Sequence, residues 1–558
     1  AGGVAPTPFN PAFMSTQSDN VNGKPVYRFT NGSATGTVDS DGNMVPLSYF
    51  FFGPNSSATP VGRAADADPI RFYALTGDIV GLYTGEILTN TAGTRTWYSG
   101  SGPLMVRAGR DIVGAGLAPG EIQASYYQDS KSRGNLIVHS DPNDVSVISA
   151  GRDIMYANFD IAGPGAIEIS AGRNLYQGDK GVIASMGPIA VGDARPGASI
   201  AMLAGVGVNG PDYDGLAARY LDAARLASSG TPLADQPGKV AKTYEKELAA
   251  WLKERYGFAG SDAEARAYFD RLAPEQRHIF LRSVYFAELT AGGREYNDEN
   301  GPRYRSYLRG REVIAALFPE TAASGGDLTM FGASGVRTLS GGDIQMLTPG
   351  GRAVIGVEAL VPPSTAGLVT QGRGDIQIYS KGSILLGLSR IMTTFGGNIL
   401  AWSAEGDINA GRGAKTTIVY TPPRRVYDNY GNVTLSPAPP SSGAGIASRS
   451  SVPGVPGGNI DLIAPLGTID AGEAGIRSGA NVNLAALHVV NAANIQAQGN
   501  TTGVPTIQAP NIGGLTEASN ASGAASKQAA NPAQSGASEQ PSVIIVEVIG
   551  FGGGNDGG

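Results

Sequence analysis

The stretch ISAGRDIMYANFDIAGPGAIEISAGRNLYQGD, residues 148–179, contains nearly the same phrase twice. ISAGRDI begins at Ile148 and ISAGRNL begins at Ile169, so the two copies lie 21 residues apart. A further copy, MVRAGRDIVGAG, places Ile112 42 residues before Ile154, which we interpret as two periods of 21 residues. Repetition at this spacing predicts stacked units of about 20 residues each.

A shorter phrase, in which glycine precedes Asp or Asn and then an apolar residue, recurs along most of the chain. Its apolar residues are Ile79, Ile344, Ile376, Ile399, Ile408 and Ile460, with related forms at Ile469 and Val482. Apolar and polar residues alternate around these positions, as in AIEIS and DIQIYS, which is typical of a strand with one buried face. We expect glycine to supply the positive φ of a tight turn, and Asp or Asn to bond its own backbone there.

One short strand cannot bury its apolar face alone, so the units must stack on one another. Leucine-rich repeats would show a leucine consensus, and propeller blades would need a period of about 40 residues or more. The sequence therefore predicts a mainly β fold, a parallel β-helix. The isoleucines of the repeat should then form ladders that point into the coils, as should Leu175.

Residues 211–318 break the glycine pattern. The segment KTYEKELAAWLKERYG places Leu248, Trp251, Leu252 and Tyr256 on one helical stripe. Ser261 followed by Glu264 is a capping box that opens the next helix. We predict an inserted all-α subdomain in which the Trp and Tyr side chains belong to the core and do not line a ligand groove.

Composition excludes several classes of protein. The net charge is −7, with no basic run of the kind that grips phosphate, so we expect no nucleic acid partner. There is no cysteine, which removes disulfides and thiolate sites. No run of about 18 apolar residues occurs, so we expect a chain that does not span a membrane.

These patterns suggest a division of the chain. We expect residues 1–210 to be the first part of the β-helix with an irregular N-terminal region, 211–318 the helical insertion, 319–513 the second part of the β-helix with a Pro-rich loop at 420–456, 514–541 a flexible linker, and 542–558 a terminal β-strand with a Gly-rich tail.

A family resemblance runs from YLRGREVIAALFPE at 307–320 through the glycine repeats that follow it to SVIIVEVIGFGGG near the end, and GDINAGRGAKT at 406–416 is its most specific part. Together these stretches resemble the carboxy-terminal region of filamentous haemagglutinin-like exoproteins, the secreted partners of two-partner (type Vb) secretion. The family's amino-terminal secretion domain, with its NPNGI-like signature, is not in this sequence. We therefore expect a carboxy-terminal portion of a longer exoprotein.

The resemblance implies a right-handed parallel β-helix that a Gram-negative cell exports through an outer-membrane two-partner transporter barrel. It implies an extracellular or cell-surface location and a role as a filamentous adhesin in cell-surface, biofilm or host attachment. The ligand is left open between a host receptor, an extracellular polysaccharide and self-association.

A polysaccharide-binding or polysaccharide-cleaving β-helix protein is the alternative. Cleavage needs clustered carboxylates beside a basic residue. Asp343, Asp375 and Asp407 recur once per repeat after a turn glycine, where a structural role explains them. The histidines, His139, His278 and His488, lack metal-ligand spacing and are interpreted as surface or packing residues. We expect no catalytic residue, no metal, no cofactor and no enzymatic activity.

Two candidate interaction segments remain. Arg373, Gly374 and Asp375 form an Arg-Gly-Asp tripeptide, a candidate cell-binding site that the repeat could also create by chance. The end of the chain holds a candidate anchoring or edge-pairing strand with Val543, Ile544, Ile545, Val546, Val548 and Ile549. That strand could pair within its own chain or with another molecule; pairing within the chain needs fewer assumptions.

Overall fold

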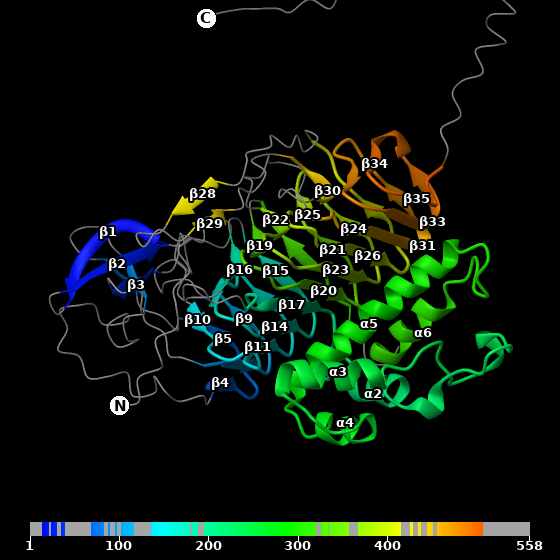
Figure 1. Cartoon of the computed structure of the whole chain (residues 1–558), viewed down its shortest axis with the longest axis horizontal. Coiled ribbons are helices and arrows are strands. Elements are labelled where there is room, and N and C mark those ends of the chain that lie inside the picture. Colours follow the sequence, from blue (N-terminus) through cyan, green and yellow to red (C-terminus); the bar gives the residue numbers. More distant parts are fainter. Residues whose placement is uncertain are drawn as a thin grey trace, which may run out of the picture. The chain divides into compact units, whose positions relative to one another are not determined.

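The structure is a computed structural model (Figure 1), in which the chain divides into the units Ala1–Pro505 and Thr506–Gly558. The second unit lies outside the described residues, and so do the expected linker at 514–541 and the candidate strand at 542–558. The structure describes residues 14–21, 24–30, 35–39, 69–82, 87–89, 95–97, 102–115, 136–178, 181–187, 195–319, 325–332, 334–356, 366–413, 424–427, 433–436, 443–449 and 455–505.

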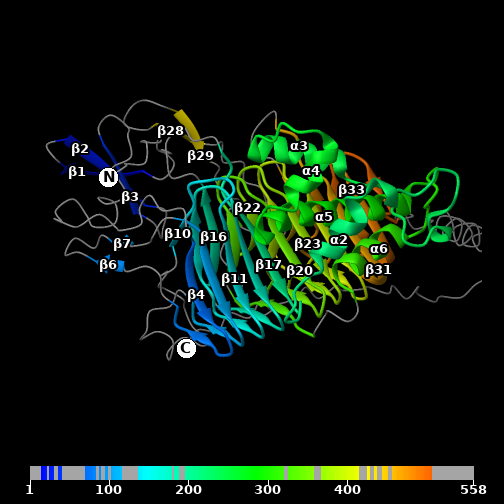
Figure 2. The same ribbon diagram turned by 90° about the horizontal axis from the view of Figure 1, so that it is seen from below.

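Short parallel strands recur in three series, so each complete coil of the chain has three faces. The first face contains β4 (Ile70–Ala74), β8 (Leu104–Ala108), β11 (Val145–Ala150), β14 (Ala166–Ala171), β17 (Ser199–Ala204), β20 (Ile344–Thr348), β23 (Ile376–Ser380), β26 (Ile399–Ser403), β31 (Ile460–Asp470), β33 (Val482–Val490) and β35 (Thr501–Thr502). Figure 2 shows strands of this face side by side, from β4 to β31. This arrangement is a parallel β-helix, as the repeat predicted.

The other two faces are built in the same way. The second face contains β5 (Ile79–Val80), β9 (Ile112–Val113), β12 (Ile154–Met155), β15 (Leu175–Gln177), β18 (Leu328–Met330), β21 (Ala353–Val354), β24 (Ile384–Leu385), β27 (Ile408–Asn409) and the ends of β31 and β33. The third face contains β10 (Leu136–Val138), β13 (Phe159–Ala162), β16 (Val182–Gly187), β19 (Gly335–Thr338), β22 (Gly367–Thr370), β25 (Arg390–Thr393), β30 (Gly445–Ser448), β32 (Ile476–Ser478) and β34 (Ile495–Ala497).

Three small antiparallel groups lie in the remaining described segments. They are β1 (Met14–Val21) with β2 (Lys24–Thr30) and β3 (Thr35–Asp39), β6 (Ile87–Thr89) with β7 (Arg95–Trp97), and β28 (Arg424–Tyr427) with β29 (Val433–Ser436). The last pair falls within the segment expected to be a Pro-rich loop.

The apolar ladders form as expected. On the first face Ile344 pairs with Ile376, which pairs with Ile399, and all three are fully buried. On the second face Ile154 pairs with Leu175, and Ile384 pairs with Ile408. The repeated phrase therefore marks two corners of one coil: the first corner, which precedes each first-face strand, and the second corner, which precedes each second-face strand.

The interpretation of the 42-residue step was wrong. Ile112 pairs directly with Ile154, so the two residues lie in adjacent coils. Their coil contains more than 21 residues, because residues 116–135, which lie outside the described residues, separate β9 from β10 in the sequence. A β-helix tolerates insertions at the corners of its coils, so the number of residues per coil varies along the sequence.

The Asp and Asn side chains at the corners also act differently from the expectation. At the first corner, the Asp343 carboxylate accepts a hydrogen bond from the backbone N–H of Asp375 at 2.8 Å, and Asp375 accepts one from Asn398 at 2.7 Å. Asn398 and Asn459 continue the series towards the later coils, since each accepts the backbone N–H of the corner residue of the next coil. Each side chain therefore satisfies a backbone group of the next coil and not its own.

The second corner adds ion pairs to the same pattern. Asp111 accepts from the backbone N–H of Asp153 at 3.0 Å, and the Arg152 guanidinium binds the same carboxylate. Asp153 and Arg173 repeat the arrangement one coil later, at 2.5 Å. In the AGRD phrase, the Arg side chain and the backbone N–H of the Asp therefore both bind the Asp carboxylate of the preceding coil.

Corner glycines are required mainly by close approach between coils. A Cβ on Gly151 would lie 2.4 Å from the carbonyl oxygen of Gly109, and one on Gly172 would lie 2.2 Å from that of Gly151. On the first corner, a Cβ on Gly374 would meet the Gly342 carbonyl oxygen at 2.1 Å. A side chain at these positions would push the coils apart, whatever its backbone conformation.

Helices fill the interval between β17 and β18. They are α2 (Tyr213–Tyr220), α3 (Glu245–Tyr256), α4 (Asp262–Phe269), α5 (Pro274–Asn297) and α6 (Leu308–Leu317), with the short 3-10 helices η2 (Ala223–Arg225) and η3 (Leu233–Asp235); η4 (Ala492–Asn494) lies later, in the last coils. The capping box of Ser261 and Glu264 opens α4. The mainly β fold with an inserted helical part is therefore confirmed.

These helices cover the outside of the first face (Figures 1 and 2). Strands such as β20 and β26 are consequently buried on both sides, whereas the alternation predicted one buried face. The outward side chains join the helices in a second core, the outer core, which includes Leu203, Leu347, Tyr379, Leu400, Trp402 and Ile463. Trp251 and Tyr256 of α3 pack against it.

Helix α5 crosses the strands of the first face, and its length matches the distance that those strands span. Its His278 contacts Glu168 on β14, and its Asn297 contacts Asn483 on β33. The 19 residues between these helical positions span about 28 Å, and six strand spacings span about 29 Å. One straight helix can therefore fasten seven successive coils.

Replacing the inward Ile376 with Ala should lower the free energy of unfolding by about 2–5 kcal/mol, because it leaves a cavity inside the ladder. Urea denaturation followed by circular dichroism measures the loss. Leu487→Ala is the control, since Leu487 is 63% exposed and should change stability by about 0.5 kcal/mol or less. Equal losses in both variants would contradict the assigned ladder.

Candidate functional site

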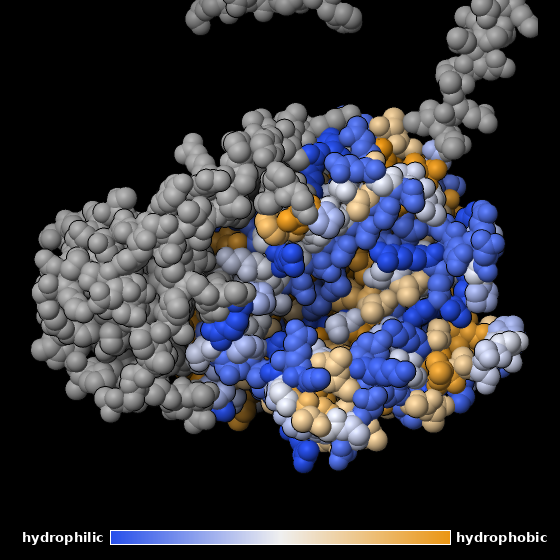
Figure 3. Space-filling model, in the orientation of Figure 1, coloured by the Kyte–Doolittle hydropathy of each residue, from blue (hydrophilic) through white to orange (hydrophobic). Residues whose placement is uncertain are grey.

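Two hollows flank the helices on the outside of the first face. The larger lies beside the first coils and the start of α5, and we call it the groove; the smaller lies beside the last coils and the end of α5, and we call it the asparagine pocket. Figure 3 shows a face of the molecule on which hydrophilic residues are interspersed with hydrophobic patches. Both hollows include polar outward residues of the first face: Glu168 and Ser170 line the groove, and Asp461 and Asn483 line the asparagine pocket.

The groove has a volume of about 1030 Å³. Its floor includes one outward side chain from each of four adjacent strands: Tyr73 pairs with Arg107, Arg107 with Ser149, and Ser149 with Ser170. Opposite this row stand residues of α2 and α5, among them Asp214 and Arg277. The groove therefore crosses the strands of β4, β8, β11 and β14.

A cluster of polar side chains closes the floor beside α5. His278 Nδ1 lies 3.2 Å from Glu168 Oε2, and the Arg282 guanidinium binds the same oxygen. Arg282 also donates to Tyr213 Oη at 3.2 Å and to Gln345 Oε1 at 2.9 Å. The His278 and Tyr213 rings stack with their centroids 3.9 Å apart.

The electrostatics of this cluster favour a permanently ionised carboxylate. Burial opposes ionisation of Glu168, but the charges of His278 and Arg282 outweigh it and lower its pKa to about 2. Burial raises the pKa of the Tyr213 hydroxyl. A general acid needs a pKa near the working pH, so Glu168 is suited to fastening α5 and not to protonating a leaving group.

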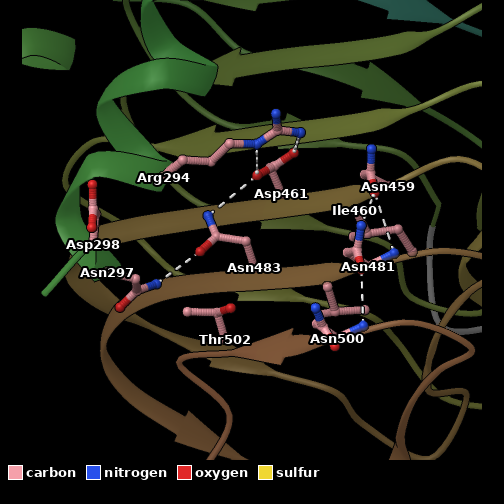
Figure 4. A pocket seen from close by; sticks show the side chains of 11 residues that line it. Arg294, Asn297, Asp298, Asn459, Ile460, Asp461, Asn481, Asn483, Asn500 and Thr502 are labelled. Carbon is pink, nitrogen blue, oxygen red and sulfur yellow. Dashed lines mark hydrogen bonds and ion pairs between the residues drawn. The ribbon is translucent and has the colours of Figure 1, made fainter. Parts of the chain in front are cut away.

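The asparagine pocket has a volume of about 400 Å³ (Figure 4). Arg294 of α5 binds the Asp461 carboxylate through two hydrogen bonds, of 3.0 and 2.8 Å. Asn483 donates to Asp461 at 3.2 Å and accepts from Asn297 at 2.8 Å. The wall opposite α5 continues the first-corner ladder with Asn459, Asn481 and Asn500. Most of these groups bind one another, so the pocket mainly fastens the end of α5.

The Arg-Gly-Asp tripeptide lies at the first corner and lines neither hollow. Arg373 is exposed, whereas Gly374 is buried against the preceding coil. Asp375 accepts the backbone N–H of Asn398, and its own N–H donates to Asp343. The carboxylate is thus already part of the ladder; receptor binding by this tripeptide stays a prediction.

The three histidines differ in burial and in the residues that they contact. His139 is fully buried between Ser146 Oγ, at 2.8 Å, and the carbonyl of Pro164, at 2.9 Å, and burial lowers its pKa. His488 is exposed. His278, which we had interpreted as a surface or packing residue, lies in the groove beside Glu168.

Sequence reasoning missed the residues of the groove. The alternation in AIEIS shows that Glu168 points away from Ile167 and Ile169, but it does not say that a helix beginning 106 residues later covers that side. Asp343 and Asp407 lie at different corners, so the recurring carboxylates do not converge. Within the described residues, no group of three or more His, Asp or Glu side chains could hold a metal ion.

Exchanging Glu168 for Gln should destabilise the protein by about 3–5 kcal/mol at pH 7, because Arg282 loses its buried carboxylate. Since folding lowers the pKa of Glu168, its contribution is complete above about pH 4.5 and is lost as the pH falls towards 2. The difference between wild type and variant should therefore shrink over this range. Urea denaturation at several pH values measures it.

Glu405→Gln is the control for this measurement. Glu405 is 59% exposed in its side chain and lies 3.9 Å from Lys381, so its loss should cost about 1 kcal/mol or less. A difference for Glu168→Gln that stays constant from pH 7 to pH 2 would contradict the assigned ion cluster.

Comparison with known proteins tests the family resemblance that the sequence suggested. None of the helices in the described part of the chain combines the length and the apolar character that a membrane span requires. No curated protein and no solved structure matches the chain significantly. Residues 396–506 match a family model described as "Filamentous haemagglutinin family outer membrane protein". The resemblance to filamentous haemagglutinin-like proteins is therefore confirmed over the last coils of the β-helix, from the turn before β26 to the end of the described residues.

Proposed function

We propose that this chain is part of a secreted or surface-displayed exoprotein of a two-partner secretion system, in which it serves as a structural rod for cell-surface, biofilm or host attachment. The observation that carries the proposal is the β-helix itself, whose last coils match the outer-membrane haemagglutinin family. Stacked coils can hold binding surfaces at fixed positions along their length. The implied location is extracellular or on the bacterial cell surface.

The proposed partner for export is an outer-membrane transporter barrel. The chain has no cysteine, so no disulfide can form before passage through such a barrel. The coils are held by hydrogen bonds between backbones and between corner side chains, which can form after export without a cofactor. The attachment partner is a host receptor, an extracellular polysaccharide or another copy of the chain.

We propose a binding role and not an enzymatic one. The groove offers Glu168 as its buried carboxylate, and a pKa of about 2 leaves it unable to donate a proton at neutral pH. Burial raises the pKa of Asp343 to about 6, but Asp343 lies at the first corner and outside both hollows. Polysaccharide binding is therefore the better supported part of the alternative, and cleavage is the weaker part.

Deleting the partner barrel should remove the exoprotein from the cell surface, because the proposal assigns export to that barrel. Antibody labelling of intact cells that produce the full-length exoprotein measures this, together with attachment of the cells to a coated surface. Restoring the barrel on a plasmid is the control. Unchanged labelling and attachment without the barrel would contradict the proposed secretion route.

Asp375→Asn tests the tripeptide without breaking the ladder, because Asn occupies the equivalent positions 398 and 459. We expect unchanged thermal stability, since the amide oxygen can still accept the N–H of Asn398. If integrin-bearing cells adhere less to the variant than to the wild type, the carboxylate is a receptor contact. Equal adhesion would assign Asp375 to the ladder alone.

A further inference from the structure

We propose that the groove binds an extended, neutral oligosaccharide. This inference rests on the proposed attachment function and names the class of ligand and the residues that contact it. Four features of the groove support it: a periodic floor, an exposed aromatic ring, an excess of carboxylates and the absence of a strand edge on the two middle strands of its floor.

The floor repeats at the spacing of the coils. Tyr73, Arg107, Ser149 and Ser170 occupy equivalent outward positions on adjacent strands. Three strand spacings place the first and last of them about 14 Å apart. A row of polar side chains at regular intervals suits a polymer that also offers polar groups at regular intervals, and the volume of about 1030 Å³ accommodates several of its units.

The chemistry of the row suits hydroxyl groups. The hydroxyls of Ser149 and Ser170 can each donate and accept a hydrogen bond, as a sugar hydroxyl can. Tyr73 is 52% exposed, so its ring offers an apolar face on which the C–H groups of a sugar ring can pack. The ring stands on β4, at the end of the row opposite to Ser170.

The charge of the walls selects against polyanions. The groove is lined by the carboxylates of Asp212, Asp214 and Glu275, against the guanidiniums of Arg107 and Arg277; its fourth carboxylate, Glu168, is already paired with Arg282. Arg277 is paired with Asp214 at 3.1 Å. A sulfated or uronic acid polymer would bring its own charges beside these carboxylates, so neutral chains are favoured.

A peptide is disfavoured by the geometry of the floor. Strands β8 and β11 are each paired on both sides, so they offer no edge for addition of a further strand. An amphipathic helix would need an apolar floor, and the row places Arg107 and two serines there. The ligand is therefore expected to use hydroxyl hydrogen bonds and ring packing.

Titration calorimetry of the purified chain with neutral hexasaccharides of glucose, galactose, mannose and N-acetylglucosamine tests the proposal. We expect at least one to bind, and Tyr73→Ala to weaken its affinity by about tenfold or more through loss of the packed ring. Ser149→Trp, which places a bulky ring in the middle of the row, should abolish binding. Tyr304→Ala is the matched control, because Tyr304 is 39% exposed in the helical insertion and away from the groove.

Three results would overturn the proposal. One is the absence of binding to every neutral hexasaccharide while both groove variants melt at the wild-type temperature. Another is binding of a heparin hexasaccharide that Arg107→Glu abolishes, which would assign the groove to polyanions. The third is a protein receptor whose capture depends on Tyr73. If one of these three results is obtained while surface attachment persists in Tyr73→Ala, the groove assignment fails and the attachment function stands.

Discussion

The distance between successive coils is the constraint on which the structure depends. Parallel strands must lie about 4.8 Å apart to exchange backbone hydrogen bonds, and the corners between them must approach equally closely. Glycine allows that approach, as at Gly374, where a Cβ would meet the carbonyl oxygen of Gly342. At the same corners, Asp and Asn side chains accept backbone N–H groups of the next coil. The glycine and the acidic residue of the repeat therefore serve one requirement.

A ladder of carboxylates would accumulate like charges, and the two corners avoid this in different ways. The first corner changes from Asp343 and Asp375 to Asn398, whose neutral amide can both donate and accept. Where two acids remain adjacent, burial and the charge of Asp375 raise the pKa of Asp343 to about 6. The second corner pairs its successive acids with arginines, as in Asp111 with Arg152 and Asp153 with Arg173, before an amide follows at Asn174. Neutral amides and ion pairs therefore both limit the repulsion between carboxylates of adjacent coils.

The sequence was sufficient for the β-helix and the inserted helices, because both rest on local periodicity and turn chemistry. It was insufficient for the pairing of coils: Ile112 and Ile154 are 42 residues apart yet adjacent, whereas the next pair, Ile154 and Leu175, is 21 residues apart. It was also insufficient for the groove, where Glu168 and His278 meet although 110 residues separate them. Which face a helical insertion covers depends on the summed packing of outward residues such as Leu347 and Trp402, and no local pattern records it.

The crossing of α5 over the first face has a consequence for the order of assembly. The helix begins its contacts on coils that precede it in the chain, at Glu168, and ends them on coils that follow it, at Asp461 and Asn483. Its last contacts join residues 167 and 186 positions apart. A chain that emerges gradually can wind its early coils at once, but the helix completes its docking only when the late coils exist. The insertion therefore completes its packing only after the coils that it spans have formed.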